Sequence, residues 1–255
     1  MGSVIFGCTD IGNSNDLSKT FFNKLNSSDA VVVENQYMWD SFCLDNDISY
    51  TKEVLSLNLP GLKGKFLNEL SEEIQKLFSD NRSAILERVH QLYKSGKSVL
   101  VLSDEGSSII ADSGEFVRNY CLKNGIDFKV MSGPSAVINS ISSSTISGSL
   151  SPFIFYGPMF SLEYLNNFLE NIDRSPCYFL SVAFLTPKTA KNVVESMLEK
   201  FGNIDACLCV DLTTDNEKII GKNLNDVVEY LQQMGDDYYI KKEKISIVFR
   251  NTGRK

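Results

Sequence analysis

The sequence predicts an α/β protein of two domains, with a parallel sheet in the first and a mixed sheet in the second. From residue 3 to about residue 148, apolar strand-like runs alternate with segments of helical spacing, the pattern of a parallel sheet with crossover helices. In the second half the last strand-like runs are short and closely spaced, which favours antiparallel pairs. We expect domains over residues 1–148 and 152–255, because 255 residues suffice for two.

Three apolar runs of the first half predict strands. Residues 4–8 and 30–33 are rich in β-branched and aromatic side chains, and residues 98–102 are apolar enough for a strand covered on both faces. Residues 17–25 and 85–93 carry apolar side chains at helical spacing and predict helices. Residues 58–82 are less regular, and we interpret them as an insertion that contains a helix.

The second half alternates in the same way after a serine-rich stretch that we interpret as a linker. The expected strands are residues 153–156, 178–184, 206–211, 218–220 and 245–250. The expected helices are residues 161–172, 187–201 and 224–234.

Composition limits the classes of function. The net charge of −7 argues against extensive contact with RNA or DNA, since phosphate neutralisation supplies much of such affinity. No apolar run approaches the roughly 20 residues of a membrane helix. The six cysteines include no C-x-x-C pair, and His90 is the single histidine, so we expect no metal site. A soluble, cytoplasmic protein is expected.

Three loops follow predicted strands of the first half, at residues 7–14, 103–114 and 132–136. A parallel sheet gathers such loops at its carboxyl edge, where ligands bind. The loops contain glycine, hydroxyl groups and acids but no lysine or arginine to meet a polyphosphate, and no G-x-G-x-x-G or P-loop pattern is present. A conjugate of adenosine with an amino acid fits this composition better than a nucleotide does.

Taken together, the loops resemble the tetrapyrrole methylase superfamily, and within it the branch of ribosomal RNA small subunit methyltransferase I. Residues 9–16 read T-D-I-G-N-S-N-D against T-P-I-G-N-x-x-D, and residues 33–35 read V-E-N. Residues 103–114 resemble S-D-A-G-x-P-x-I-x-D-P-G, and residues 133–136 read G-P-S-A. Residues 155–157 resemble the F-x-G motif that begins the second domain.

The resemblance implies a methyltransferase of two α/β domains that form homodimers, with the cofactor S-adenosylmethionine in the cleft between the domains. It identifies no catalytic residue. The residues it implies as cofactor contacts lie in the three loops and at three places in the second domain. They are Ile11, Gly12, Asp104, Gly106, Ser107, Ile110, Ser135, Ala136, Tyr156, Ala183, Leu212 and Thr213.

Several positions depart from the family pattern. The proline after the first strand is Asp10 here, and the A-G-x-P stretch has Glu105 and Ser108 in place of its alanine and proline. Residues 184–189 read F-L-T-P-K-T where RNA methylases of the family carry Y-E-S-P-H-R. These departures weaken the inference that the substrate is ribosomal RNA more than they weaken the inference that the cofactor is S-adenosylmethionine.

Three functions stay open. The first is methylation of a ribose 2′-hydroxyl in ribosomal RNA, the second is methylation of a small molecule or peptide, and the third is cofactor binding without catalysis. A hydroxyl acceptor must lose a proton. The acids near the predicted site are Asp10, Glu34, Asp104 and Asp112, each of which also suits a turn or cap. Tyr37 and Trp39 suit an acceptor pocket or simple packing.

Overall fold

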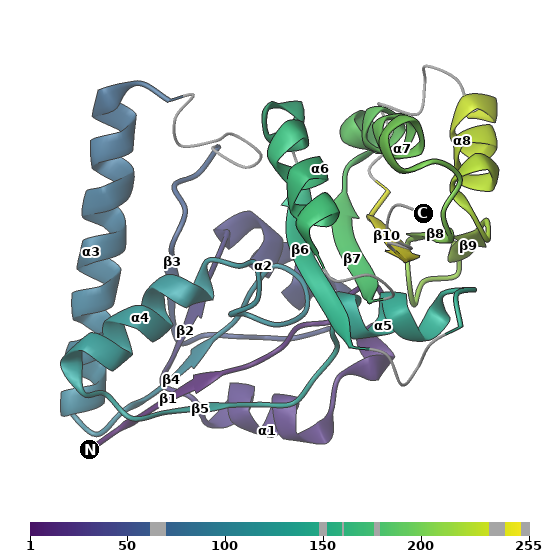
Figure 1. The fold of residues 1–255 in the computed structure, drawn as a ribbon. Helices are drawn as coiled ribbons and strands as arrows, with labels where there is room; N and C mark the ends of the chain where they lie inside the picture. The colour runs from purple at the N-terminus through teal and green to yellow at the C-terminus, as the bar shows by residue number, and fades with distance from the viewer. Residues whose placement is uncertain (62–69, 148–151, 160, 176–178, 235–242, 251–255) are drawn as a thin grey trace. The chain divides into compact units, whose positions relative to one another are not determined.

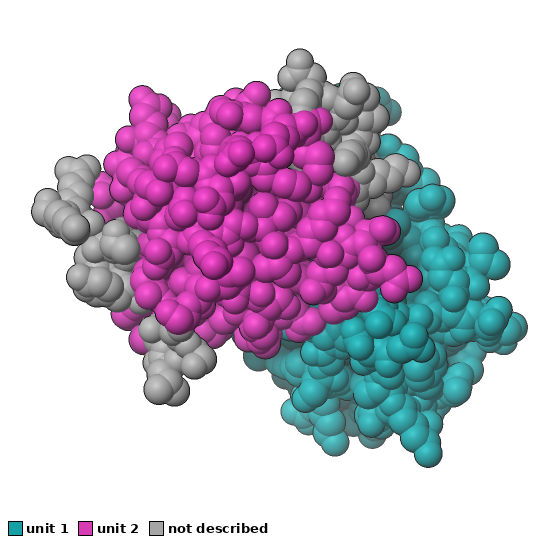
Figure 2. All heavy atoms as spheres, turned by 90° about the vertical axis from the view of Figure 1, so that its right-hand side faces the viewer, with its two compact units in different colours: residues 1–135 teal, residues 136–255 magenta. Residues whose placement is uncertain are grey.

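A computed structural model describes the chain except residues 62–69, 148–151, 160, 176–178, 235–242 and 251–255. The chain divides into two compact units, Met1–Ser135 and Ala136–Lys255 (Figure 2). Helix α5 (Ala136–Ser143) therefore belongs to the second unit, whereas the sequence analysis grouped it with the first domain. The reason is packing, since Val137 of α5 is buried among side chains of the second unit's sheet.

The first unit holds a five-stranded sheet in the order β3-β2-β4-β1-β5, in which every pair of neighbours is parallel. Four helices connect the strands (Figure 1). The strands are β1 (Ser3–Phe6), β2 (Ala30–Val33), β3 (Glu53–Ser56), β4 (Ser98–Val101) and β5 (Phe128–Val130). The helices are α1 (Lys19–Ser27), α2 (Gln36–Asp45), α3 (Glu72–Lys94) and α4 (Gly114–Asn124), with a short 3-10 helix at Ser14–Asp16.

Both faces of this sheet are buried, which explains the uninterrupted apolar runs of its central strands. Successive residues point to opposite faces, so Val99 and Val101 pack with α3 and α4 while Leu100 and Leu102 pack with α1 and α2. The unit is therefore a three-layer sandwich with one core on each side of the sheet.

The second unit holds a mixed five-stranded sheet in the order β6-β7-β10-β8-β9. Only the pair β6–β7 is parallel, and the other neighbouring pairs are antiparallel. Its strands are β6 (Phe153–Met159), β7 (Leu180–Leu185), β8 (Ala206–Val210), β9 (Lys218–Ile220) and β10 (Ile245–Arg250). Helices α6 (Leu165–Arg174), α7 (Pro187–Phe201) and α8 (Leu224–Gln233) cover one face, and α5 covers the other.

Residues 184–189, which lack the family's Y-E-S-P-H-R element, contain the start of helix α7. Thr186 caps α7 and forms a reciprocal capping box with Thr189, while Pro187 occupies the first turn, where its missing N–H costs nothing. The Thr189 hydroxyl also donates to the Met159 carbonyl at 2.7 Å, which ties α7 to β6. The substituted residues therefore fix the start of a helix.

The predicted α/β class, with a parallel first sheet and a mixed second sheet, is confirmed. Strand β3 and helices α2 and α4 were not predicted, and the strand before the loop at residues 132–136, which is β5, was expected without bounds. The helix expected within residues 58–82 lies partly outside the described residues; from Glu72 onward it is continuous with the next predicted helix, as the single helix α3. Among the described residues, no helix is long and apolar enough to cross a membrane.

The buried centre of the first sheet predicts a large packing penalty at Leu100, which is fully buried between β4 and the α1–α2 layer. Leu100→Ala should lower the free energy of unfolding by about 2–5 kcal/mol through lost burial and the cavity left behind. Leu122→Ala, at a side chain 58% exposed on α4, should change it by less than about 0.5 kcal/mol. Urea unfolding followed by circular dichroism measures both, and equal effects would contradict the assigned core.

Candidate functional site

A crevice for ligands is expected where neighbouring parallel strands send their connections in opposite directions. In the first unit this happens between β1 and β4. The chain leaves β1 toward α1 and β2 on one side of the pair, and it leaves β4 toward α4 and β5 on the other. The loops that follow β1 and β4 therefore flank the position where the topology predicts a ligand crevice, and they contain most of the first-domain residues implied as cofactor contacts.

Backbone hydrogen bonds join these two loops directly. The Thr9 N–H donates to the Gly106 carbonyl at 3.0 Å, and the Gly106 N–H donates to the Asp10 carbonyl at 3.1 Å. Cys8 and Ser107 form an isolated antiparallel bridge beside them. The Ser103 hydroxyl donates back to the Gly106 carbonyl at 2.9 Å. The loop after β4 is therefore held against the loop after β1 and not left free to move alone.

Two glycines allow the three loops to meet. Gly106 has φ of +70°, a conformation that other residues rarely adopt, and a Cβ there would stand 3.1 Å from the Ile11 side chain and 3.6 Å from the Pro134 carbonyl oxygen. A Cβ on Gly133 would lie 2.5 Å from the Cβ of Cys8, closer than real atoms approach. The loops after β1, β4 and β5 thus pack closely, with the glycine backbone against the side chains of Ile11 and Cys8.

The substituted positions of the loops have local explanations. Asp10 accepts a hydrogen bond from the Gly12 N–H at 3.0 Å, so its carboxylate closes the turn that a proline closes in the family pattern. Ser108 is 1% exposed and its hydroxyl has no hydrogen-bond partner within the described part of the chain. A buried hydroxyl without a partner costs free energy, so the serine is a defect in the packing of the loop.

Polar side chains occupy the other half of the sheet edge, at the ends of β2, β3 and β4. The Ser113 N–H donates to Asp112 at 2.7 Å, and the Ser113 hydroxyl donates to Glu34 at 3.0 Å. Burial, together with the charge and hydrogen bonding of Glu34 and a smaller contribution from Asp104, raises the pKa of Asp112 to about 9. Asp112 therefore carries a proton near neutral pH.

Asn35 and Asn58 belong to the same polar half. The Asn35 amide donates to the Asp104 carboxylate at 2.7 Å, and the Asn58 amide donates to Asn35 at 3.3 Å. Sequence reasoning singled out Glu34, Asp104 and Asp112 but neither named Asn58 nor gave Asn35 a role of its own. The family-like V-E-N triplet was the only available signal for Asn35, and nothing in the sequence marked Asn58.

The first-domain residues implied as cofactor contacts differ in exposure. Ile11 and Gly106 are buried, Gly12 is exposed, and Ile110 is 55% exposed. Ser107 takes part in the bridge to Cys8, and Asp104 lies at the junction with the polar half. Ser135 ends the loop after β5, and Ala136 begins α5.

The residues implied in the second domain do not lie together. Tyr156 stacks on Phe249 and donates from its hydroxyl to Ser175 at 2.6 Å. It packs, with the fully buried Ala183, in the core under α6, α7 and α8. Leu212 instead packs in the smaller core on the α5 side of the sheet. Their role in cofactor binding stays a prediction, as does that of Thr213, which has φ of +68° and donates from its N–H to Glu217 at 2.7 Å.

Trp39, Tyr37 and His90, which the sequence also brought into consideration, have different surroundings. Trp39 is buried, stacked on Phe42 and in edge contact with Tyr50, while Tyr37 is 74% exposed. His90 faces the Tyr120 hydroxyl at 3.2 Å, between α3 and α4. Within the described ranges no group of histidine, cysteine and acidic residues could hold a metal ion. Cys177 lies outside those ranges. The cysteines within them are free thiols.

Comparison with known proteins gives one family. The model of the family described as Tetrapyrrole (Corrin/Porphyrin) Methylases matches residues 10–228. Similar curated proteins include the ribosomal RNA small subunit methyltransferase I of Thermotoga maritima, 22% identical over 91% of this chain and 93% of the relative. The protein of that name from Vibrio cholerae is 25% identical over 96% of this chain and 77% of the relative.

Solved structures show the same fold at lower identity. A cobalamin-synthesis-related protein of Corynebacterium diphtheriae superposes with a TM-score of 0.62 at 13% identity, over 99% of each chain. The uroporphyrin-III C-methyltransferase of Thermus thermophilus, solved with S-adenosylhomocysteine, superposes with a TM-score of 0.59 at 13% identity, over 97% of each chain. These likenesses confirm the predicted fold.

The raised pKa of Asp112 predicts a specific dependence of stability on pH. The folded chain keeps a proton on Asp112 that the unfolded chain releases near pH 4. The contribution of this proton to the free energy of unfolding is therefore complete below that pH and is lost as the pH rises toward 9. Asp112→Asn cannot titrate. Between pH 5 and pH 8 its free energy of unfolding should therefore rise by about 1 kcal/mol or more relative to the wild type. Parallel pH profiles of the two proteins in urea unfolding would show that Asp112 holds no such proton.

The orphan hydroxyl of Ser108 predicts a stabilising substitution. Ser108→Ala removes a buried group that has no partner while keeping the volume of the loop nearly unchanged. The free energy of unfolding should rise by about 1 kcal/mol. Thermal unfolding measures this as a higher Tm. Ser107→Ala, at a half-buried neighbour, serves as the control and should not raise the Tm. A lower Tm for Ser108→Ala would mean that the hydroxyl is satisfied in solution.

Proposed function

The chain belongs to the tetrapyrrole methylase family, and from that premise we propose that it transfers a methyl group from S-adenosylmethionine to a ribose hydroxyl of ribosomal RNA. Methyl transfer is the activity of the family, and the chain is a methyltransferase dependent on S-adenosylmethionine. The identity of the acceptor goes beyond that shared activity. It is supported by the curated relatives, which match most of this chain and are named ribosomal RNA small subunit methyltransferase I.

The residues around the β1–β4 crevice suit S-adenosylmethionine. The cofactor has no phosphate, and the loops at residues 7–14, 103–114 and 132–135 contain no lysine or arginine. Gly106 and Gly133 let the three loops pack closely on one another, because a Cβ at either position would press on Ile11 or Cys8. The Asp104 carboxylate supplies a negative charge, which suits ribose hydroxyls or the cationic part of the cofactor. The single observation that carries this placement is the backbone pairing of the two loops at Gly106.

When bound, S-adenosylmethionine supplies an electrophilic methyl group on a positively charged sulfur. The chain's own contribution is to position the acceptor and to take up its proton. Glu34 follows β2 and Asp112 lies just before α4, and Ser113 forms hydrogen bonds to both carboxyl groups. Asp112 carries a proton near neutral pH because its pKa is raised. We propose that this pair, through Glu34, accepts the proton that an acceptor hydroxyl loses.

Two observations favour a second candidate, a small molecule or peptide as acceptor. The net charge of −7 does not favour a polyanionic partner, and residues 184–189 lack the histidine and arginine of the family's RNA methylases. A cofactor-binding protein without catalysis is the third candidate, supported by Glu105 and Ser108 in the loop after β4.

We further propose, from the family resemblance, that the protein is a cytoplasmic homodimer. Light scattering of the purified chain would test the dimer.

The proposed proton acceptor predicts a loss of rate without a loss of cofactor affinity. With labelled S-adenosylmethionine and small-subunit ribosomal RNA, Glu34→Gln should lower the rate of transfer by about a hundredfold. Its affinity for S-adenosylhomocysteine in calorimetry should be unchanged, because Glu34, which accepts from Ser113, is proposed to act on the acceptor and not on the cofactor. Glu115→Gln, at an exposed acid in the first turn of α4, is the matched control.

The outcomes separate the candidates. Cofactor binding together with labelling of RNA at a ribose supports the first candidate. Binding with labelling of a small molecule or peptide, and not of RNA, would support the second. Binding with no transfer to any acceptor would support the third, and absence of binding to the cofactor product would contradict all of them.

A further inference from the structure

A chain of four side chains crosses the carboxyl ends of β4, β2 and β3 and continues to helix α3. The Arg82 guanidinium donates from Nη2 to Asn58 Oδ1 at 3.0 Å. Asn58 Nδ2 donates to Asn35 Oδ1 at 3.3 Å, and Asn35 Nδ2 donates to Asp104 Oδ2 at 2.7 Å. These residues are far apart in sequence, yet each hydrogen bond links neighbouring elements of the fold.

The chemistry of the two ends fixes the direction of every bond in this relay. A guanidinium can only donate hydrogen bonds, and a carboxylate can only accept them. Each asparagine between them must therefore turn its carbonyl toward Arg82 and its amide nitrogen toward Asp104. Reversing either amide would place two donors or two acceptors face to face. The charged ends thus select one orientation of Asn35 and Asn58.

Arg82 is held where it can act in this way. Its guanidinium lies 4.1 Å from the centre of the Phe78 ring and 4.0 Å from that of the Phe116 ring, so two aromatic faces enclose it. Burial lowers the pKa of Arg82, and the nearby charge of Glu34 opposes that shift. The adjacent Asn81 amide donates to the carbonyls of Ser56 and Leu57, which fixes α3 against the end of β3.

We propose that Arg82 is a positioning residue for cofactor binding: acting through Asn58 and Asn35, it sets the position of the Asp104 carboxylate in the cofactor loop. The inference rests on the proposed contact between Asp104 and S-adenosylmethionine. Arg82 itself need not touch the ligand. Its effect reaches the crevice because a well-oriented Asn35 amide holds Asp104 in one rotamer before the cofactor arrives, which lowers the entropy lost on binding.

A double-mutant cycle on cofactor affinity tests the relay. The ligand is S-adenosylhomocysteine and the measurement is calorimetry, on variants shown by circular dichroism to be folded. Arg82→Leu, which keeps an apolar side chain between the two rings, should weaken binding by about tenfold. Arg82→Lys, which keeps a cationic donor, should recover part of that loss. Asn35→Ala should weaken binding to a similar extent, and adding Arg82→Leu to it should cause no further loss.

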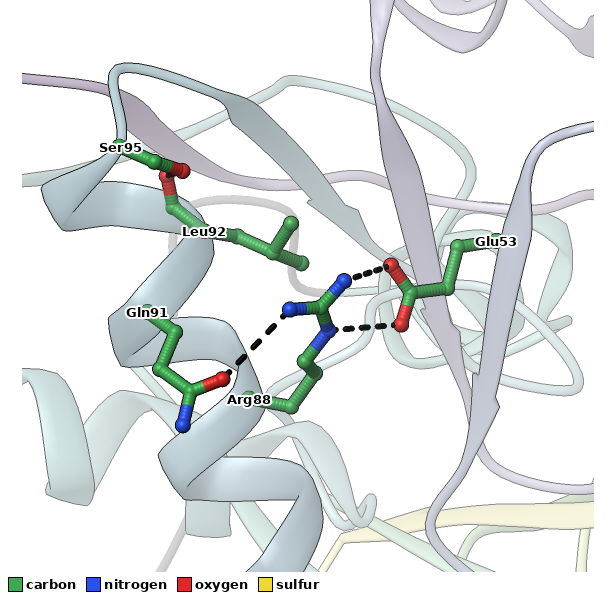
Figure 3. A network of polar contacts seen from close by, with 5 residues as sticks. All are labelled: Glu53, Arg88, Gln91, Leu92 and Ser95. Atoms are coloured by element: carbon green, nitrogen blue, oxygen red, sulfur yellow. Dashed lines mark hydrogen bonds and ion pairs between the residues drawn. The ribbon is translucent and has the colours of Figure 1, made fainter.

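Arg88 supplies a matched control on the same helix. It makes a two-pronged ion pair with Glu53 of β3, at 2.8 and 2.9 Å, and also reaches Gln91 (Figure 3). Arg88→Gln removes an arginine that joins α3 to β3, and Arg82→Leu removes one that joins α3 to Asn58 just after β3. The hydrogen bonds of Arg88 run to Glu53 and Gln91, neither of which belongs to the relay. It should leave the affinity for S-adenosylhomocysteine within about twofold of the wild type.

A ligand-free readout accompanies the cycle. In nitrogen–proton NMR spectra, the side-chain amide signals of Asn35 and Asn58 should shift in Arg82→Leu and stay in place in Arg88→Gln. Equal losses of affinity in the two arginine variants, additive losses in the Arg82–Asn35 pair, or an unmoved Asn35 signal would overturn the relay while leaving the proposed function intact. A wild-type chain that does not bind S-adenosylhomocysteine would overturn both.

Discussion

The pairing of the loop after β1 with the loop after β4 is the constraint on which the rest of the site depends. Two backbone hydrogen bonds, from Thr9 to Gly106 and from Gly106 to Asp10, fix the loops against each other. They form only because Gly106 adopts a positive φ and has no Cβ to collide with Ile11. The relative position of the two loops is therefore fixed by backbone hydrogen bonds and by the absence of a side chain at Gly106.

The paired loops divide the carboxyl edge of the sheet into two chemically different halves. Beside β1 and β5 the edge is made mainly of glycine and small residues, with Asp10 as its acidic side chain. Beside β2 and β3 it carries Glu34, Asn35, Asn58 and, from the loop after β4, Asp112. Asp104 stands where the halves meet. One half suits the recognition of a cofactor by close approach, and the other suits the handling of an acceptor's proton.

The sequence predicted the fold class, the family resemblance and most of the elements, because buried parallel strands and amphipathic helices leave strong periodic signals. It did not predict β3, whose four residues are half-buried and include Glu53 and Ser56. It also missed α2, on which Trp39 is the buried residue and the apolar stripe is weak, and α4, which buries only small side chains such as Val117 and Cys121. The contact between Asn35 and Asp104 joins residues 69 positions apart, and local pattern carries no information about such a pair.

Departures from the family motif were visible in the sequence, but their consequences were not. Asp10 replaces a proline by closing the turn with its carboxylate, and Thr186 with Thr189 caps α7 where the family's RNA methylases carry other chemistry. Ser108 is different, since its hydroxyl is buried without a partner in the described chain. Only the surroundings distinguish a compensated substitution from a defect.

Hydrogen–deuterium exchange with and without S-adenosylhomocysteine tests the central claim most directly, because it locates the ligand without assuming which side chains contact it. If the crevice between β1 and β4 holds the cofactor, saturation with ligand should slow the exchange of backbone amides in the loops at residues 8–14, 103–114 and 132–135. Protection confined to other parts of the chain, with these three loops unchanged, would contradict the account.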